Sequence, residues 1–244
     1  MVHPAPREVE DLPAVSENLM TAQDRRRILL REIDLVIDGG ANVGQYARWL
    51  RHCGYGGEIV SFEPASETFE VLSEAARSDD GWRCRNVALG PEDGEVRLHL
   101  TRTSLGSSVF RRTALHSQLW PRDVEAGSEV VPVRSLRSLW SELGCGNRRV
   151  YLKLDVEGAE LSVLEGTGEF LDQITLVEVE LPLIGMHHDT PTFLDVLNFL
   201  TARGFSTVAL EQNHRGDETT GQMLIVDGIF RSRAAGLRDA RPDR

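Results

Sequence analysis

The first residues that can support chemistry form a glycine-containing stretch that begins with an acid. Asp38, Gly40, Asn42 and Gly44 recur there at every second position. The glycines allow backbone angles and close approaches that a Cβ atom would block. A carboxylate at the start of such a loop would repel a pyrophosphate, but it suits the cationic amino and sulfonium groups of S-adenosylmethionine. The stretch therefore favours a methyl donor over a dinucleotide.

A second acid, Glu63 in Phe62-Glu63-Pro64, predicts an adenosine contact without deciding between these cofactors. A carboxylate after the second strand can accept hydrogen bonds from two ribose hydroxyls, and NAD enzymes place an acid at the same point. Asn86, after the next apolar run, either lies beside the adenine or ends a strand in a turn. The polar stretch 101–108 is either a surface loop or a lid over a ligand, with Ser107 as a candidate contact.

Asp155 begins a second group of candidate residues, at the end of the apolar run 149–154. Methyl transfer needs an aligned acceptor oxygen and a group that removes its proton, and a carboxylate or a histidine can do both. Strand alternation places Lys153 on the same face as Asp155, as a buried counter-ion that keeps the acid ionised. In the structural alternative, Asp155 and Glu157 would cap the next helix. We predict a chemical role for Asp155, and both interpretations stay open for Glu157.

Glu180 and His187 extend this group. Glu180 ends a later predicted strand at the same sheet edge, and His187 lies in the loop that follows it. Asp155 and Glu180 are acids of the kind that binds Mg²⁺, but two acids are too few to define a metal site. A hydrogen bond from Glu180 to a sugar hydroxyl is the more economical hypothesis. His187 lies where an acceptor would enter and is a candidate base or substrate contact.

An alternating α/β framework must position these residues. Strands are predicted at 34–38, 57–62, 82–88, 149–155, 174–180, 205–211 and 222–230, with further extended pieces at 94–100 and 129–133. Helices are predicted at 44–53, 65–77, 136–143, 191–203 and from Ala159 onward. The last two strands should pair antiparallel, and ligands should bind outside the carboxyl ends of the parallel strands.

The ends of the chain differ from this framework. Residues 1–31 are predicted to be a loose arm followed by a helix, which Ser16 or Thr21 caps. Residues 32–232 form the expected domain, and residues 233–244 a disordered charged tail. The triplet Arg25–Arg27 is interpreted as a solvated helix face without a further role.

The composition of the 244-residue chain restricts its partners. There are 27 Lys and Arg residues against 38 Asp and Glu residues, and this net charge of −11 opposes a broad electrostatic contact with nucleic acid or an anionic membrane. No apolar run approaches the roughly 20 residues of a membrane span. The three cysteines are far apart, which favours neither a zinc site nor a disulfide framework. We expect a cytoplasmic protein with a small-molecule partner, and both a monomer and a homo-oligomer remain open.

Three motifs together resemble the FkbM family of S-adenosylmethionine-dependent methyltransferases. They are the glycine stretch 38–45, Phe62-Glu63-Pro64, and the run 152–160 with the pattern Lys-x-Asp-x-Glu-Gly-x-Glu. The resemblance implies a Rossmann-like methyltransferase fold, a mostly parallel sheet of seven strands with an antiparallel last strand and helices on both faces. It also implies methyl transfer to a hydroxyl of a sugar, a glycolipid or another natural product. Two residues depart from the family pattern: Arg137 stands where Asp is usual, and His187 near a position where Tyr is common.

Two other functions compete with this prediction. An NAD-dependent oxidoreductase would share Glu63, but Asp38 and Asn42 argue against it. A binding module that holds the cofactor without acceptor chemistry is disfavoured by the presence of Asp155 and Glu180.

Overall fold

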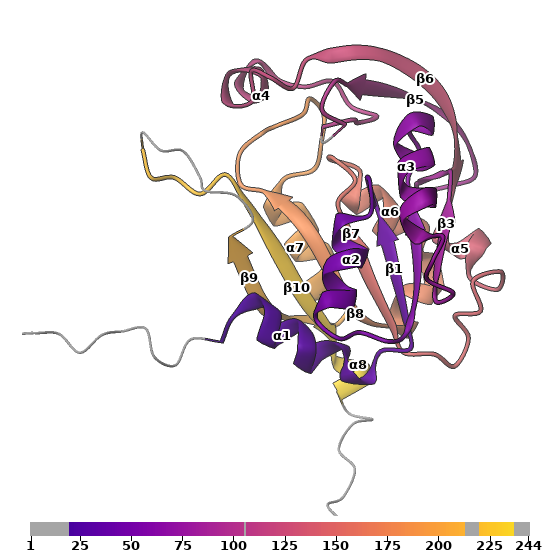
Figure 1. Ribbon diagram of the computed structural model, residues 1–244. Helices are drawn as coiled ribbons and strands as arrows, with labels where there is room; N and C mark the ends of the chain where they lie inside the picture. The colour runs from indigo at the N-terminus through magenta and orange to yellow at the C-terminus, as the bar shows by residue number, and fades with distance from the viewer. Residues whose placement is uncertain (1–19, 105, 213–219, 237–244) are drawn as a thin grey trace, which may run out of the picture.

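A seven-stranded sheet forms the centre of the computed structural model, in the order β3-β2-β1-β7-β8-β10-β9 (Figure 1). The structure describes residues 20–104, 106–212 and 220–236. The strands of this sheet are β1 (Leu35–Gly39), β2 (Glu58–Phe62), β3 (Trp82–Arg85), β7 (Val150–Leu154), β8 (Ile174–Pro182), β9 (Phe205–Gln212) and β10 (Ile225–Ser232). Only β10 runs antiparallel to its neighbours, β8 and β9, among these strands. The predicted fold class, a Rossmann-like methyltransferase sheet, is confirmed.

Helices cover both faces of this sheet. The helices of the described residues are α1 (Ala22–Leu29), α2 (Gln45–His52), α3 (Ser66–Ala76), α4 (Ala114–Leu119), α5 (Leu136–Leu139), α6 (Glu160–Gly166), α7 (Phe193–Ala202) and α8 (Arg233–Gly236), with the 3₁₀ turns η1 (Leu30–Glu32) and η2 (Gly168–Gln173). Val36 and Ile59 pack under α1 to α3, whereas Leu35 and Ile37 pack on the opposite side with α5 to α7. Strand β1 is buried along its whole length, as its continuous apolar run predicts.

A second, three-stranded sheet is the main feature that the sequence pattern did not predict. Its strands β4 (Ala88–Leu89), β5 (Gly94–Thr101) and β6 (Glu125–Arg134) pair in the order β4-β6-β5. The predicted strand 82–88 therefore ends at Arg85, because Ala88 and Leu89 pair with β6 instead. Helix α4 was also not predicted, and the helix predicted at 136–143 ends at Leu139.

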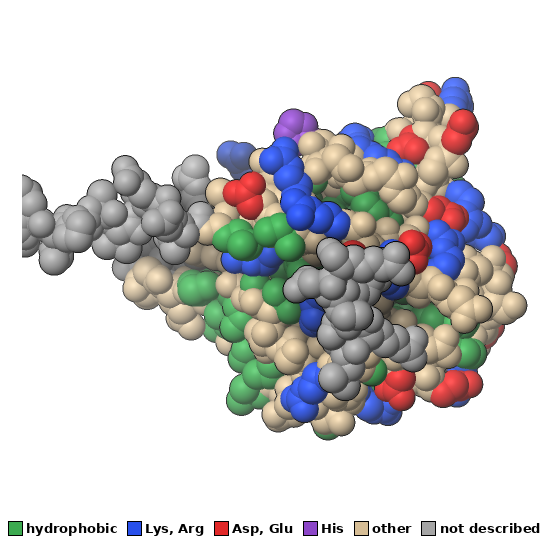
Figure 2. All heavy atoms as spheres, turned by 90° about the horizontal axis from the view of Figure 1, so that it is seen from below, with side chains coloured by type: hydrophobic (Ala, Val, Ile, Leu, Met, Phe, Trp, Pro, Cys, Tyr) green, Lys and Arg blue, Asp and Glu red, His purple; other side chains and the backbone are tan. Residues whose placement is uncertain are grey.

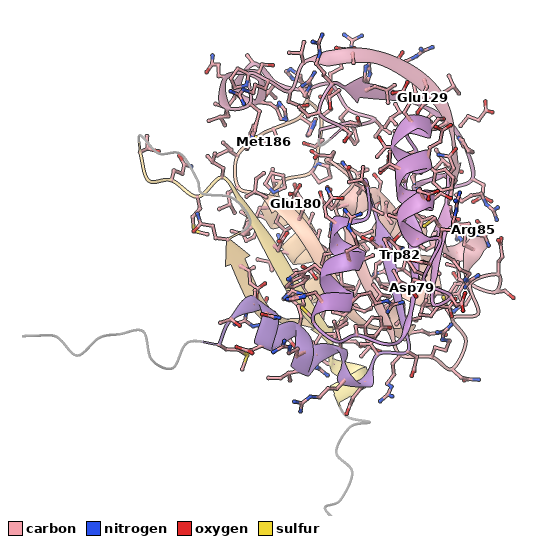
Figure 3. All side chains as sticks on the ribbon, viewed as in Figure 1. Asp79, Trp82, Arg85, Glu129, Glu180 and Met186 are labelled. Atoms are coloured by element: carbon pink, nitrogen blue, oxygen red, sulfur yellow. The ribbon has the colours of Figure 1, made fainter. Side chains whose placement is uncertain are left out.

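This small sheet covers the carboxyl ends of the parallel strands. In Figure 1, β5 and β6 curve over the top of the central sheet. Glu129 of β6 lies near the upper end of α3 in Figure 3, and its carboxylate accepts a hydrogen bond of 2.9 Å from the backbone N–H of Ser66. The second sheet thus encloses the edge at which the candidate residues were expected.

Figure 2 looks at the opposite end of the molecule, where the side chains that are coloured by type include acidic and basic ones interspersed with apolar ones. Among the described residues, no helix is both long enough and apolar enough to cross a bilayer. The predicted arm 1–15 lies outside the described residues, as does the predicted tail from residue 237 onward, whereas Arg233–Gly236 form α8.

Helix α1 begins as predicted, because the Thr21 side chain accepts a hydrogen bond from the backbone N–H of Asp24 at 3.1 Å. The interpretation of the arginine triplet as a solvated face was wrong for Arg26. Its side chain is only 2% exposed and forms ion pairs with Glu178 of β8 and, at 3.0 Å, Glu211 of β9. Sequence periodicity could not reveal this, because both carboxylates come from strands more than 150 residues away along the chain.

The ion pair predicts unequal effects of two neighbouring substitutions. Arg26→Ala would leave the Glu178 carboxylate buried without its guanidinium, so the free energy of unfolding should fall by about 3 kcal/mol or more. Arg27→Ala is the matched control, since the Arg27 side chain is 50% exposed and its loss should change stability by ~0.5 kcal/mol or less. Urea denaturation of both variants measures this difference, and equal midpoints would show that the buried pair does not stabilise the fold.

Candidate active site

The glycine loop after β1 connects the ends of β2 and β7. The backbone N–H groups of Gly40 and Ala41 both donate to the Phe62 carbonyl at 3.0 Å. Gly40 has a φ of +76°, and a Cβ atom there would lie 1.8 Å from the carbonyl oxygen of Asp155. The loop therefore needs glycine at this position both for its backbone angle and for its approach to the end of β7.

Glu63 holds this loop to the end of β2. One carboxylate oxygen accepts the backbone N–H of Asn42 and the other accepts that of Ala65, both at 2.9 Å. Burial raises the pKa of Glu63 to about 7, although the two backbone hydrogen bonds act in the opposite direction. Asn86 supports the same corner, because its side-chain amide donates to the carbonyls of Glu63 and Pro64 at 3.0 Å.

Asp38 and Gly44, like Asn86, were predicted to contact the cofactor but do not line the cavity beside this loop. Asp38 is completely buried, and one of its oxygens accepts a hydrogen bond of 2.9 Å from the Ser61 hydroxyl. Its other oxygen has no hydrogen-bond partner among the described residues, and burial raises its pKa to about 6. Gly44 precedes α2 with a φ of +83°, and a Cβ atom there would lie 2.6 Å from the Trp82 ring. Both residues shape the loop from behind because the pleat and the packing of α2 point them into the protein.

The cavity itself has a volume of about 460 Å³ and opens at the carboxyl ends of β1, β2 and β7. Predicted residues that line it are Gly40, Asn42, Glu63, Lys153, Asp155 and Ser107. Ser107 comes from the polar stretch 101–108, so that stretch closes one side of the cavity rather than forming a separate surface loop. Asn86 stands behind the wall and positions Glu63.

Lys153 and Asp155 form the predicted ion pair. The Lys153 ammonium lies 2.8 Å from an Asp155 oxygen and 5.2 Å from the centre of the Tyr46 ring. Burial by itself would lower the pKa of Lys153, but the charges of Asp155 and Asp38 outweigh it and raise the pKa. Lys153 is therefore a buried, charged group that holds Asp155 at the cavity surface.

Helix α6 has no side-chain cap, and the backbone donors of the turn before it bond to Glu160 rather than to Asp155 or Glu157. The Glu160 carboxylate accepts the backbone N–H groups of Val156 at 3.0 Å and Gly158 at 3.2 Å. This arrangement closes the turn between β7 and α6. Because Glu160 satisfies these donors, the side chains of Asp155 and Glu157 are available to face the cavity.

Three acids come together at this edge. Asp155, Glu157 and Glu180 each offer a carboxylate oxygen, and these oxygens lie within 4.8 Å of one another. Glu180 reaches this point from β8, as Figure 3 shows. Burial, followed by the negative charge of Asp155, raises the pKa values of Glu157 and Glu180 well above the usual range.

A second cavity of about 350 Å³ lies beside the acids. Glu157 lines both cavities, whereas Glu180, His187 and Trp120 line only the second. The His187 side chain is 2% exposed, and its Nε2 lies 4.0 Å from a Glu157 oxygen without a hydrogen-bond partner among the described residues. Burial lowers the pKa of His187 to about 4, so its imidazole is neutral near pH 7.

Sequence reasoning missed several residues around this second cavity. His116 of α4 packs its ring 5.5 Å from the His187 ring and 5.1 Å from the Trp120 ring. Asp123 lies nearby and pairs with Arg112 at 3.2 Å. The available signal was Thr113, which caps α4 through the backbone N–H of His116, but a helix of 6 residues carries too little periodicity to be identified.

Comparison with known proteins places this geometry in a family. The model of the methyltransferase FkbM domain matches residues 38–207. Methyltransferase 1 of Beauveria bassiana is 29% identical over 60% of this chain, and the match spans 64% of that protein, less than two thirds of its length. Hexuronic acid methyltransferase AglP of Haloferax volcanii is 25% identical over 84% of this chain and 78% of its own.

A solved structure agrees with the fold alone. Streptococcus pneumoniae Sp1610 in complex with S-adenosyl-L-methionine superposes with a TM-score of 0.50 at 9% identity, over 86% of this chain and 71% of that one. At 9% identity, the likeness concerns only the arrangement of strands and helices.

The loop geometry predicts the effect of adding one methyl group. Gly40→Ala would bring its Cβ to 1.8 Å from the Asp155 carbonyl at a φ of +76°, so the free energy of unfolding should fall by about 3 kcal/mol. Gly56→Ala is the control, because nothing lies within 4 Å of a Cβ atom at that position. Thermal unfolding followed by circular dichroism compares the two, and a Gly40→Ala midpoint equal to that of Gly56→Ala would contradict the prediction.

Proposed function

Because the chain belongs to the FkbM family of methyltransferases, we propose that it transfers a methyl group from S-adenosylmethionine to a hydroxyl oxygen of a sugar, a glycoside or another natural product. The observation that carries this proposal is the meeting of two cavities at Glu157. One cavity would hold the donor and the other the acceptor, so that the reacting atoms meet at the acidic edge between them.

The donor would occupy the cavity beside the glycine loop. Glu63 faces this cavity, and each of its oxygens keeps a lone pair for a ribose hydroxyl beyond the backbone hydrogen bond that it accepts. Phe62, Val87 and Leu89 supply apolar walls on which an adenine can pack. The aminoacyl end would point toward Asp155, whose carboxylate attracts the positive charges of the amino and sulfonium groups. Asp155 thereby takes the role that the sequence suggested for Asp38.

The acceptor would occupy the second cavity. Trp120 and His116 offer ring faces, Met186 offers an apolar surface, and Glu180 offers a hydrogen-bond acceptor for a hydroxyl. Figure 3 shows Met186 in the loop beyond Glu180, on the side of α4. Rings with a nearby carboxylate suit a sugar, which has both apolar C–H faces and hydroxyl donors. The name of the AglP relative, a hexuronic acid methyltransferase, supports a sugar as the acceptor class.

The reaction requires alignment and removal of one proton. The acceptor oxygen attacks the methyl carbon, the carbon–sulfur bond breaks, and its electron pair stays on sulfur to give uncharged S-adenosylhomocysteine. The hydroxyl proton must leave as the new carbon–oxygen bond forms. Glu157, Glu180 and His187 line the second cavity and offer groups that can receive it in their unprotonated forms.

Two measurements test the proposal. Calorimetry should detect binding of S-adenosylhomocysteine, and mass spectrometry should detect a gain of one methylene in a member of a panel of sugars and glycosides incubated with the donor. Absence of cofactor binding would refute the proposal at its first step. Donor binding without transfer to any hydroxyl in a broad panel would refute the acceptor class.

The raised pKa of Glu63 predicts that cofactor affinity depends on pH. The ionised carboxylate accepts two ribose hydroxyls, and it forms as the pH rises through about 7, so affinity for S-adenosylhomocysteine should increase about tenfold between pH 6 and pH 8. Glu63→Gln should bind more weakly and without this dependence. Glu67→Gln, an exposed change on the neighbouring helix, should keep the unsubstituted profile. A pH dependence that survives in Glu63→Gln would assign the titration to another group.

Adjacent histidines provide a test of the acceptor side. His187 lines the second cavity, so His187→Gln should lower turnover by roughly a hundredfold while the affinity for S-adenosylhomocysteine stays unchanged. His188 is exposed, and His188→Gln should leave both quantities unchanged. Steady-state kinetics with an acceptor from the panel, together with calorimetry, separates the two effects. Equal turnover in the two variants would remove His187 from the acceptor site.

A further inference from the structure

The three acids between the cavities come from two separate parts of the chain. Asp155 follows β7, Glu157 lies in the turn before α6, and Glu180 belongs to β8. Their oxygens nevertheless lie within 4.8 Å of one another. Lys153 contributes one positive charge to this edge through its contact with Asp155.

An independent observation at the same point is the orientation of His187. Its side chain is 98% buried, Nε2 lies 4.0 Å from a Glu157 oxygen, and this nitrogen has no hydrogen-bond partner in the described part of the chain. A buried nitrogen without a partner is costly unless a ligand bonds to it. His187 thus places a nitrogen without a partner among the described residues beside Glu157, one of the three carboxylates.

We propose that Asp155, Glu157 and Glu180 bind a divalent cation of the Mg²⁺ and Mn²⁺ class, with the His187 imidazole beside Glu157. Oxygens on opposite sides of such an ion are about 4.2 Å apart, and those of a larger ion such as Ca²⁺ about 5 Å apart, so oxygens within 4.8 Å can share one ion. Carboxylates select hard cations, and the neighbouring imidazole favours Mn²⁺ over Ca²⁺. The sequence had suggested only Asp155 and Glu180, and the fold adds Glu157 as a third carboxylate and brings His187 beside it.

The position of the site gives the cation a purpose. Glu157 lines both cavities, so the remaining coordination positions of the ion would face the acceptor. A cation there orients a hydroxyl and makes it more acidic. This purpose rests on the proposed methyl transfer, whereas the binding of the cation does not.

Binding can be measured with Mn²⁺ as the probe, in the full chain and without donor or acceptor. Titration followed by electron paramagnetic resonance should show loss of the free Mn²⁺ signal at one site per chain. Glu180→Gln should weaken this binding by roughly tenfold or more, because it removes a charged ligand at nearly constant shape. Glu74→Gln is the matched control, since its carboxylate is exposed on α3 and pairs with Arg77.

Two further measurements keep the outcome decisive. Circular dichroism and S-adenosylhomocysteine affinity establish whether Glu180→Gln is folded, and His187→Gln serves as the second variant if it is not. Weaker Mn²⁺ binding in a folded site variant, with unchanged binding in Glu74→Gln, supports the proposal. Absence of saturable Mn²⁺ binding in the unsubstituted protein, or equal affinity in site and control variants, overturns it. Cofactor binding without Mn²⁺ binding would reject the cation site and leave the proposed methyl transfer intact.

Discussion

The structure depends on a line of buried charges on one face of the central sheet. Asp38, Lys153 and Glu178 occupy matched positions on β1, β7 and β8, and Arg26 reaches Glu178 from α1. Ionised groups lose hydration when they are buried, and only opposite charges and hydrogen bonds at short distance offset that loss. The register of three strands and the position of α1 are therefore tied together. The same line orients Asp155, because Lys153 contacts it directly.

The acids of the site fall into two groups, those that bond to backbone N–H groups and those that face the cavities. Glu160 satisfies backbone donors in the turn after β7, and Glu63 does the same for the glycine loop. Asp155 and Glu157 are consequently not needed as caps and can face the two cavities. Similar carboxylates thus act either as supports or as chemical groups according to which backbone N–H groups lie within reach.

The acceptor side is built differently from the donor side. The donor cavity is formed by the ends of central strands and by the loops that follow them, where parallel α/β sheets commonly bind ligands. The second cavity uses α4 and the loop after β8, with His116 packed against His187. Neither α4 nor this loop belongs to the central sheet.

The sequence by itself determined the central sheet, the glycine loop, the position of Glu63 after β2, and the pairing of Lys153 with Asp155. These features depend on local rules: apolar runs form buried strands, glycine permits positive φ, and alternate residues of a strand share a face. The tertiary structure alone decided that Asp38 is buried, that Arg26 is an internal ion-pair partner, and that Glu157 lies close to both Glu180 and His187. The physical reason is that burial and convergence depend on which distant segments pack together, and neither residue type nor local spacing specifies that packing.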